Sequence, residues 1–325
     1  MNFNKKLLLF FSFLAFFIPF SVFAYSDRVI LGGNNIGISV NTKNVLVVGF
    51  YKVDNKYVAK DKGIKIGDSI THIGGVEVHN INDVVSLINE KKVNDMVEIS
   101  VLRNNKTYNY NIDLYKENGT YKTGIYIKDN ITGIGTLTYI DPESKIFGAL
   151  GHEIINSFDN KIVDISFGKI FKADITGSVK SKVNFTGEKR AVFDSSVTYG
   201  NINENTIKGI YGVYSSSYDV NRLIEVSDSV NLGKAYIYTV LEDNDIGEYE
   251  INILKVNDKT DTKNILFEIT DKKLLDKTNG VIKGMSGSPI VQNGKLVGAV
   301  THAIVSDNSK GYGIFITKML EEGEN

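Results

Sequence analysis

The chain has 325 residues with 37 Lys and Arg, 38 Asp and Glu, four His and no Cys. The absence of Cys excludes disulfide-stapled scaffolds, Cys-ligated zinc sites and thiol catalysis. A net charge of -1 lacks the basic excess typical of nucleic-acid binding, and 42% apolar residues are enough to bury a core.

The N-terminal segment, residues 1–24, has the pattern of an export signal. Lys5 and Lys6 precede an apolar run that ends at Ala24, which predicts a signal peptide or a short membrane anchor. Pro19 and the marginal length for a bilayer span favour the signal peptide, and an uncleaved anchor stays open. Because this segment holds two Lys and no acidic residue, its removal changes the net charge from -1 to -3. We expect the rest of the chain to work outside the cytoplasm.

Residues 35–116 have the pattern of a small β-rich domain with one helix. Residues 45–50 form an apolar strand, and residues 62–73 form a turn that leads into an alternating strand. Asn82 is the expected cap of a helix that runs to about Lys91. A hairpin over residues 97–114 closes the unit.

This stretch resembles a PDZ domain. The segment NIGI at Asn35–Ile38 matches the carboxylate-binding loop of that family, and GIKIGDSITHIGGVEV matches its G-x-x-x-G-D-x-I signature. The resemblance implies that Ile36, Gly37 and Ile38 bind a peptide C-terminus while the peptide adds a strand beside the helix. His72 and His79 have no acid–nucleophile partners nearby in the sequence, so we interpret them as structural or exposed rather than catalytic.

Residues 117–325 form short β-type runs broken by Gly, Asn, Asp and Ser. This spacing favours a barrel or a sandwich over a parallel α/β sheet. The sequence has no phosphate-binding loop between a strand and a helix, and its acidic residues lack calcium-loop spacing. We therefore expect no cofactor and no metal.

Two short segments of this second domain carry the chemistry: FGALGH, ending at His152, and GMSGSP, with Ser286 at its centre. A serine becomes a nucleophile when an imidazole takes its proton and backbone N–H groups stabilise the oxyanion. Gly284 allows a turn that points its own N–H and that of Ser286 the same way, which predicts an oxyanion hole. A strand, a turn and a strand follow the serine, so an α/β-hydrolase elbow is disfavoured.

GMSGSPIVQNGKLVGAV resembles the G-x-S-G-G-P region of chymotrypsin-like proteases, with Ser288 in place of the second glycine. The chain is more closely similar to the SpoIVB peptidase family (stage IV sporulation protein B), whose G-A-L-G-H and G-M-S-G-S-P motifs are intact here. The resemblance implies a mainly β chain, with a PDZ domain followed by a double β-barrel. It also implies His152 as general base and Ser286 as nucleophile. His302 is expected to line the substrate cleft.

The acid of the triad is less constrained by the sequence. In the family it precedes the serine, in a segment that resembles Thr270–Leu275, which implies Asp271. Asp159, Asp164 and Asp194 stay open as alternatives, and Asp271 also fits a helix N-cap.

The resemblance implies a serine endopeptidase that acts in sporulation signalling, in the space between the mother-cell and forespore membranes. It implies autoproteolysis and cleavage of a membrane-associated regulatory protein, with the PDZ domain binding peptide tails. The expected partners are thus a protein substrate, the protein itself and a PDZ ligand, without nucleic acid. A non-catalytic PDZ adaptor with a degenerate protease domain is the alternative.

Overall fold

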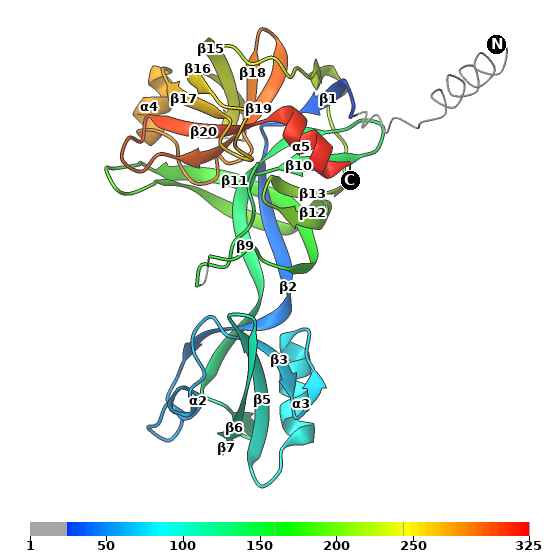
Figure 1. Cartoon of the computed structure of the whole chain (residues 1–325), viewed down its shortest axis with the longest axis vertical. Helices are drawn as coiled ribbons and strands as arrows, with labels where there is room; N and C mark the ends of the chain where they lie inside the picture. Colours follow the sequence, from blue (N-terminus) through cyan, green and yellow to red (C-terminus); the bar gives the residue numbers. More distant parts are fainter. Residues whose placement is uncertain (1–24, 159, 243, 325) are drawn as a thin grey trace, which may run out of the picture.

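The computed structural model describes residues 25–158, 160–242 and 244–324. The predicted signal segment, residues 1–24, lies outside the described residues. Within the described ranges, no helix is both long and apolar enough to cross a bilayer. Two β-barrels lie together at one end of the molecule and the PDZ domain lies at the other, joined by β2 and β9 (Figure 1).

The PDZ domain packs around one apolar cluster that extends from Val45 to Ile125. Its elements are α2 (Val58–Lys62), β3 (Ser69–Ile73), β4 (Val76–Glu77), α3 (Ile81–Lys91), β5 (Met96–Arg103), β6 (Lys106–Asp113), β7 (Tyr115–Glu117) and β8 (Thr120–Lys122). Helix α3 begins two residues before the expected position, because its N-cap is Asn80 rather than Asn82. The Asn80 side chain accepts a hydrogen bond from the Asp83 N–H at 3.0 Å.

Two strands, β2 (Asn35–Phe50) and β9 (Ile125–Ile140), belong to both parts of the molecule. They pair antiparallel along most of their length, from Asn35 opposite Thr136 to Phe50 opposite Ile125. Sixteen residues each, at about 3.3 Å per residue, let them run through two cores. The first half of β2 packs in the protease core, and its second half packs in the PDZ core. The PDZ domain is therefore an insertion between the protease halves of β2 and β9.

The first barrel is a closed ring in which each strand pairs with the next: β2, β9, β10, β13, β12, β11 and back to β2. The remaining bounds are β10 (Ile146–Ala149), β11 (Ile165–Val179), β12 (Glu188–Thr206) and β13 (Gly209–Tyr214). Strands β1 (Arg28–Leu31) and β14 (Leu223–Glu225) extend the sheet beyond β9, and the short 3-10 helix η1 (Val220–Arg222) precedes β14. Buried Ile, Val, Leu and Phe side chains fill this barrel.

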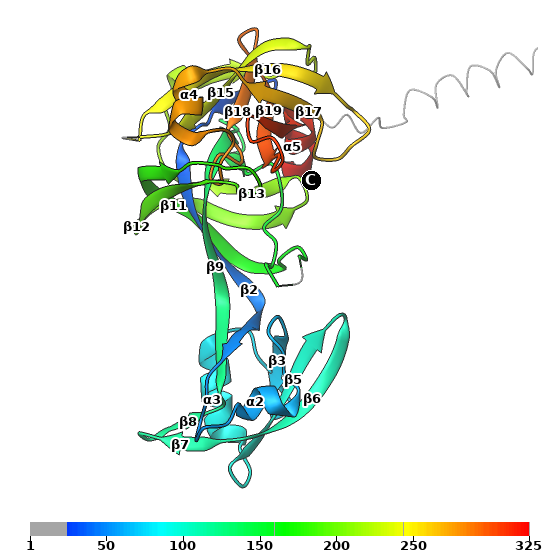
Figure 2. The same ribbon diagram turned by 90° about the vertical axis from the view of Figure 1, so that its left-hand side faces the viewer.

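The second barrel is closed by strands from the last third of the chain, in the order β15, β16, β17, β20, β19, β18. Its elements are β15 (Gly233–Val240), β16 (Ile246–Val256), β17 (Ile265–Ile269), α4 (Lys272–Thr278), β18 (Pro289–Gln292), β19 (Lys295–Ala303), β20 (Lys310–Phe315) and α5 (Ile316–Gly323). It packs on the first barrel in both side views (Figure 2). The predicted fold class, mainly β with a PDZ domain followed by a protease domain, is confirmed.

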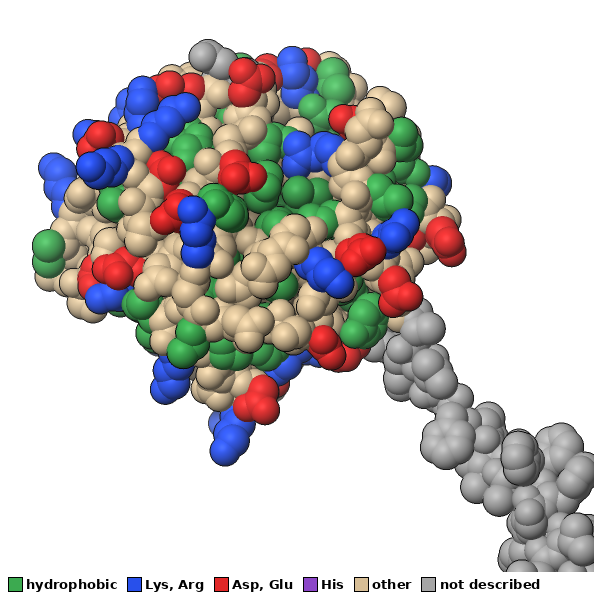
Figure 3. All heavy atoms as spheres, turned by 90° about the horizontal axis from the view of Figure 1, so that it is seen from above, with side chains coloured by type: hydrophobic (Ala, Val, Ile, Leu, Met, Phe, Trp, Pro, Cys, Tyr) green, Lys and Arg blue, Asp and Glu red, His purple; other side chains and the backbone are tan. Residues whose placement is uncertain are grey.

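The surface of the second barrel has no dominant sign of charge. Seen from above, acidic and basic side chains are interspersed across it (Figure 3). This face therefore offers no basic stripe of the kind that follows a phosphate backbone.

Candidate active site

Ser286 lies in a tight turn between α4 and β18, and most N–H groups of this turn are already paired. The N–H groups of Met285, Gly287 and Ser288 donate to the carbonyls of Ile282, Val300 and Met285 at 2.7–3.1 Å. Among the described residues, the N–H groups of Gly284 and Ser286 have no such acceptor. The predicted oxyanion donors are thus left unpaired by the backbone of the described residues.

Two glycines allow this turn to form and to lie close to the first barrel. Gly284 and Gly287 have φ values of +94° and +90°, in the left-handed region that favours glycine. A Cβ at Gly287 would lie 2.1 Å from the Thr136 carbonyl oxygen and 2.5 Å from the Leu150 nitrogen. Because Leu150 is two residues before His152, the serine turn touches the histidine segment directly.

His152 follows β10 on a left-handed turn, with Leu150 and Gly151 both at φ +69°. Its Nδ1 lies 2.7 Å from the Glu153 carbonyl oxygen. A carbonyl only accepts, so Nδ1 carries the proton and Nε2 keeps a lone pair. Burial lowers the pKa of His152, and the Glu153 carbonyl partly opposes this. The ring is thus held as a neutral base.

Ser286 and His152 border the same short segment of β19. The Ser286 hydroxyl donates to the Thr301 carbonyl at 3.0 Å, and the His152 ring lies against the His302 ring, with centroids 5.2 Å apart. The serine hydroxyl is therefore directed at the Thr301 carbonyl in this arrangement, and its proton must turn to an imidazole for catalysis.

His302, which is expected to line the substrate cleft, lies against the His152 ring. Its Nδ1 is buried without a hydrogen-bond partner among the described residues. Burial lowers the pKa of His302 to about 4, helped by the nearby His152 and Lys263. His302 is therefore neutral near pH 7.

The structure does not bring Asp271 to His152, which corrects the expectation that it completes the triad. Its carboxylate accepts a hydrogen bond from the Leu274 N–H at 2.8 Å and caps α4. Asp271 lies beyond the end of β17, directly before α4. The His152 Nδ1, which the acid of a triad would hold, instead lies 2.7 Å from the Glu153 carbonyl oxygen.

Asp164 and Asp194 do not fill that role either. Asp164 pairs with Lys43 at 2.7 Å and is largely exposed. Asp194 is partly exposed, and hydrogen bonds from Ser196 lower the pKa of its carboxyl. Asp159 lies outside the described residues. The group that orients His152 here is therefore the backbone carbonyl of Glu153.

Two threonines of β9 hold the serine turn, and the sequence interpretation missed them. The hydroxyl of Thr136 donates to the Gly284 carbonyl and that of Thr138 to the Gly287 carbonyl, both at 2.8 Å. Both side chains are fully buried. Alternation along GIGTLTYID places them on one face of a strand, which was the available signal.

The predicted peptide-binding residues Ile36, Gly37 and Ile38 are not a free loop, which corrects that assignment. They lie in β2 with β9 on one side and β11 on the other. Ile36 and Ile38 are buried in the first barrel, and a Cβ at Gly37 would lie 2.3 Å from the Phe171 ring. Their backbone groups already pair within the sheet, so a peptide cannot add a strand there.

The first half of β9 offers an edge instead. Residues 125–128 pair with β2 on one side, and no described strand pairs with the other side of residues 125–129. Helix α3 lies alongside: the Ile81 N–H donates to the Asp129 carboxylate at 2.9 Å, and Lys92, just beyond the helix, lies over the Tyr121 ring. A strand edge beside a helix is the arrangement that accepts an extended peptide.

The described residues contain no group of three or more His, Asp or Glu side chains placed to hold a metal ion.

Comparison with known proteins gives two family matches. Residues 119–320 match the model of the SpoIVB peptidase S55 family, which covers more than half of the chain. The chain belongs to the SpoIVB peptidase S55 family. It is therefore a serine peptidase, a hydrolase, and residues 34–114 match the PDZ domain model. The predicted family and the order of its domains are confirmed for this S55 peptidase.

The crystal structure of the PDZ domain of an SdrC-like protein from Listeria monocytogenes is 29% identical to this S55 peptidase. The match covers 28% of this chain and 93% of that one, with a TM-score of 0.23. No curated protein matches the chain significantly.

Proposed function

We propose that this S55 peptidase is an endopeptidase in which Ser286 attacks the peptide carbonyl and His152 Nε2 takes the serine proton. The Gly284 and Ser286 N–H groups then stabilise the tetrahedral oxyanion. The observation that carries this proposal is that, of the N–H groups from Gly284 to Ser288, these two alone lack an acceptor among the described residues. The Glu153 carbonyl takes the place of the triad's carboxylate, because it accepts the hydrogen bond from His152 Nδ1.

A fluorophosphonate probe tests this assignment. We expect the probe to label the wild-type protein and the Ser288→Ala variant. It should not label Ser286→Ala. Loss of labelling in Ser288→Ala alone would move the nucleophile to that residue. A folded wild-type protein that takes no label would contradict the proposal and favour the PDZ adaptor.

We further propose that the peptidase acts outside the cytoplasm, in sporulation signalling, and cleaves itself and a membrane-associated regulatory protein. The composition of residues 1–24 and the family name support this. Self-cleavage is tested by mass spectrometry of the purified protein: fragments in the wild type that are absent from Ser286→Ala are expected. Identical fragment patterns would contradict it, and N-terminal sequencing of exported protein tests cleavage after Ala24.

We propose that the PDZ domain takes the C-terminus of a peptide along residues 125–129 of β9. Gly124, with φ +75°, precedes this edge. The Tyr51 N–H donates to the Gly124 carbonyl at 3.0 Å, which fixes the chain just before this edge. The terminal carboxylate of the peptide would bind at this turn.

Hydrogen exchange locates this edge. A peptide with a free C-terminal valine should slow exchange at residues 125–129, whereas its amidated form should not. The amides of residues 36–38 should show no change, because they are already paired in the barrel. Protection at residues 36–38 without protection at residues 125–129 would overturn the assignment.

A further inference from the structure

Lys189 is a buried cation at the start of β12, and no described carboxylate forms an ion pair with it. The residue is 5% exposed. Its Nζ donates to Asn35 Oδ1 at 2.7 Å and to Thr239 Oγ1 at 2.8 Å, both neutral oxygens. A buried ammonium normally needs an anion to offset its lost hydration. Burial of this ammonium therefore destabilises the fold. A role for Lys189 other than stability is indicated by the residues that it contacts.

The stem of Lys189 packs against Gly284, the first donor of the oxyanion hole. A Cβ placed on Gly284 would lie 3.0 Å from Cδ and 3.2 Å from Cβ and Cγ of Lys189. The Lys189 N–H also donates to the Lys283 carbonyl at 3.0 Å. On its other side, the Gly284 carbonyl accepts the hydroxyl of Thr136. Gly284 is thus held between β12 and β9 with its own N–H left unpaired.

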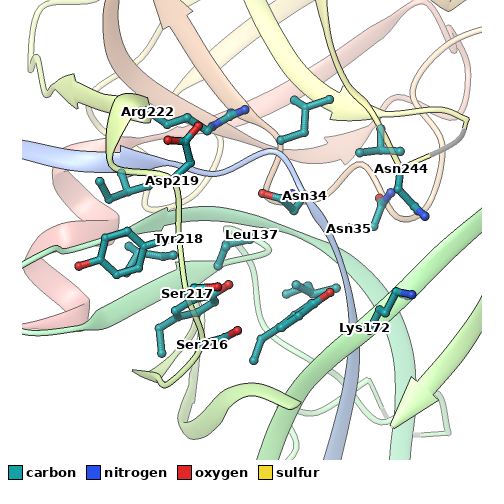
Figure 4. A pocket seen from close by; sticks show the side chains of 18 of the residues that line it. Asn34, Asn35, Leu137, Lys172, Ser216, Ser217, Tyr218, Asp219, Arg222 and Asn244 are labelled. Atoms are coloured by element: carbon teal, nitrogen blue, oxygen red, sulfur yellow. The ribbon is translucent and has the colours of Figure 1, made fainter. Parts of the chain in front are cut away.

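The ammonium also joins the two barrels behind the serine turn. Asn35 begins β2 of the first barrel, and Thr239 lies in β15 of the second. Asn35 lines a cavity of about 710 Å³ (Figure 4), and its Nδ2 is buried without a partner among the described residues. An apolar side chain of the same length could pack on Gly284 equally well. The amine therefore contributes something that packing does not require.

We propose that Lys189 is a positioning residue of the oxyanion hole, which fixes Gly284 and places a positive charge behind it when the carbonyl oxygen becomes negative. This inference rests on the proposed catalytic role of Gly284 and Ser286. A fixed charge in a water-excluded site favours developing opposite charge more than it would in solvent.

The protonation of Lys189 supplies a signature that packing alone would not produce. Burial lowers the pKa of Lys189 to about 7. The side-chain groups that face its amine, from Asn35 and Thr239, are neutral, while its neighbours Glu188 and Arg190 are exposed. Activity should therefore fall as the pH rises through about 7, because Lys189 then loses its positive charge.

Lys189→Met tests the proposal, because it keeps the stem and removes the amine. We expect kcat and the rate of fluorophosphonate labelling to fall by about 10- to 100-fold with KM almost unchanged, and the descending limb near pH 7 to disappear. Arg190→Met removes an exposed charge one residue away and should leave both rates unchanged. A folded Lys189→Met protein with wild-type kcat and pH profile would overturn the proposal.

A second variant covers the case in which Lys189→Met does not fold. Thr239→Val keeps the amine but removes one acceptor from its charged form, so the pKa of Lys189 should fall and the descending limb should move to lower pH. An unmoved limb would overturn the role of Lys189. If even the wild type takes no fluorophosphonate label, the proposed function fails instead, which is a separate outcome.

Discussion

The PDZ domain and the contact between the two barrels both bury charged or polar groups, but they do so differently. In the PDZ domain, Asp68 is 1% exposed and accepts two hydrogen bonds at 2.6 Å from Arg103, so charge meets charge. At the barrel contact, Lys189, Thr136 and Thr138 are buried against neutral oxygens. The Asp68–Arg103 ion pair stabilises the PDZ domain. The groups at the barrel contact instead hold the turn at Ser286, in which two N–H groups are unpaired.

This comparison predicts that changes at the barrel contact affect activity and that changes in the PDZ pair affect stability. His152→Ala should give the largest effect, a loss of activity of roughly 10⁴- to 10⁶-fold, because it removes the proposed general base. Its melting temperature should stay within a few degrees of the wild type. Steady-state hydrolysis of a peptide substrate and circular dichroism measure the two. Full activity in His152→Ala would remove the basis of the catalytic assignment.

Arg103→Met should have the next largest effect, on stability. It leaves the Asp68 carboxylate buried without its partner, so the free energy of unfolding of the PDZ domain should fall by about 3 kcal/mol. Urea unfolding followed by circular dichroism measures this loss. The double variant with Asp68→Leu should recover most of it, since no unpaired charge remains.

A double variant as unstable as Arg103→Met would show that packing, not the unpaired carboxylate, causes the loss. The rate of fluorophosphonate labelling at low denaturant serves as the control for the barrel contact. It should match the wild type.

The fall of kcat/KM on the acidic side, caused by protonation of His152, is expected at a lower pH than for a histidine with an ordinary pKa. Burial lowers the pKa of His152 from 6.5, so the base keeps its lone pair as the pH falls below that value, and kcat/KM should decline only in more acidic solution. Measuring kcat/KM from pH 4 to 8 locates the limb. A limb at or above pH 6.5 would show that solvent reaches the imidazole.

The smallest effects are expected at Asp271. Asp271→Asn keeps an N-cap acceptor for the Leu274 N–H, so stability and kcat should both stay near wild type. Asp271→Ala should lose about 1 kcal/mol of stability through the missing cap. Thermal unfolding and peptide hydrolysis test both variants. A severe fall of kcat in Asp271→Asn would restore this residue as the acid of the triad.

The family, the order of the domains and the mainly β fold could be predicted from the sequence, because short motifs carry them. The turn at Ser286 needs Gly284 and Gly287 at fixed spacing, and the two glycines are only three positions apart in the chain. The PDZ pattern was similarly local, with a helix and strands that alternate in the expected order. The residues 36–38 were misassigned because the same apolar alternation suits a strand in either domain.

The turn around Ser286 and the turn before His152 were thus determined by the sequence itself, since local backbone sterics define them. Only the tertiary structure decided what surrounds them. Thr136 reaches Gly284 across 148 positions, and Lys189 reaches Asn35 across 154. Asp271 caps α4, because the first N–H groups of that helix have no acceptor within the helix. Contacts over such separations depend on which strands meet, and no local pattern encodes that.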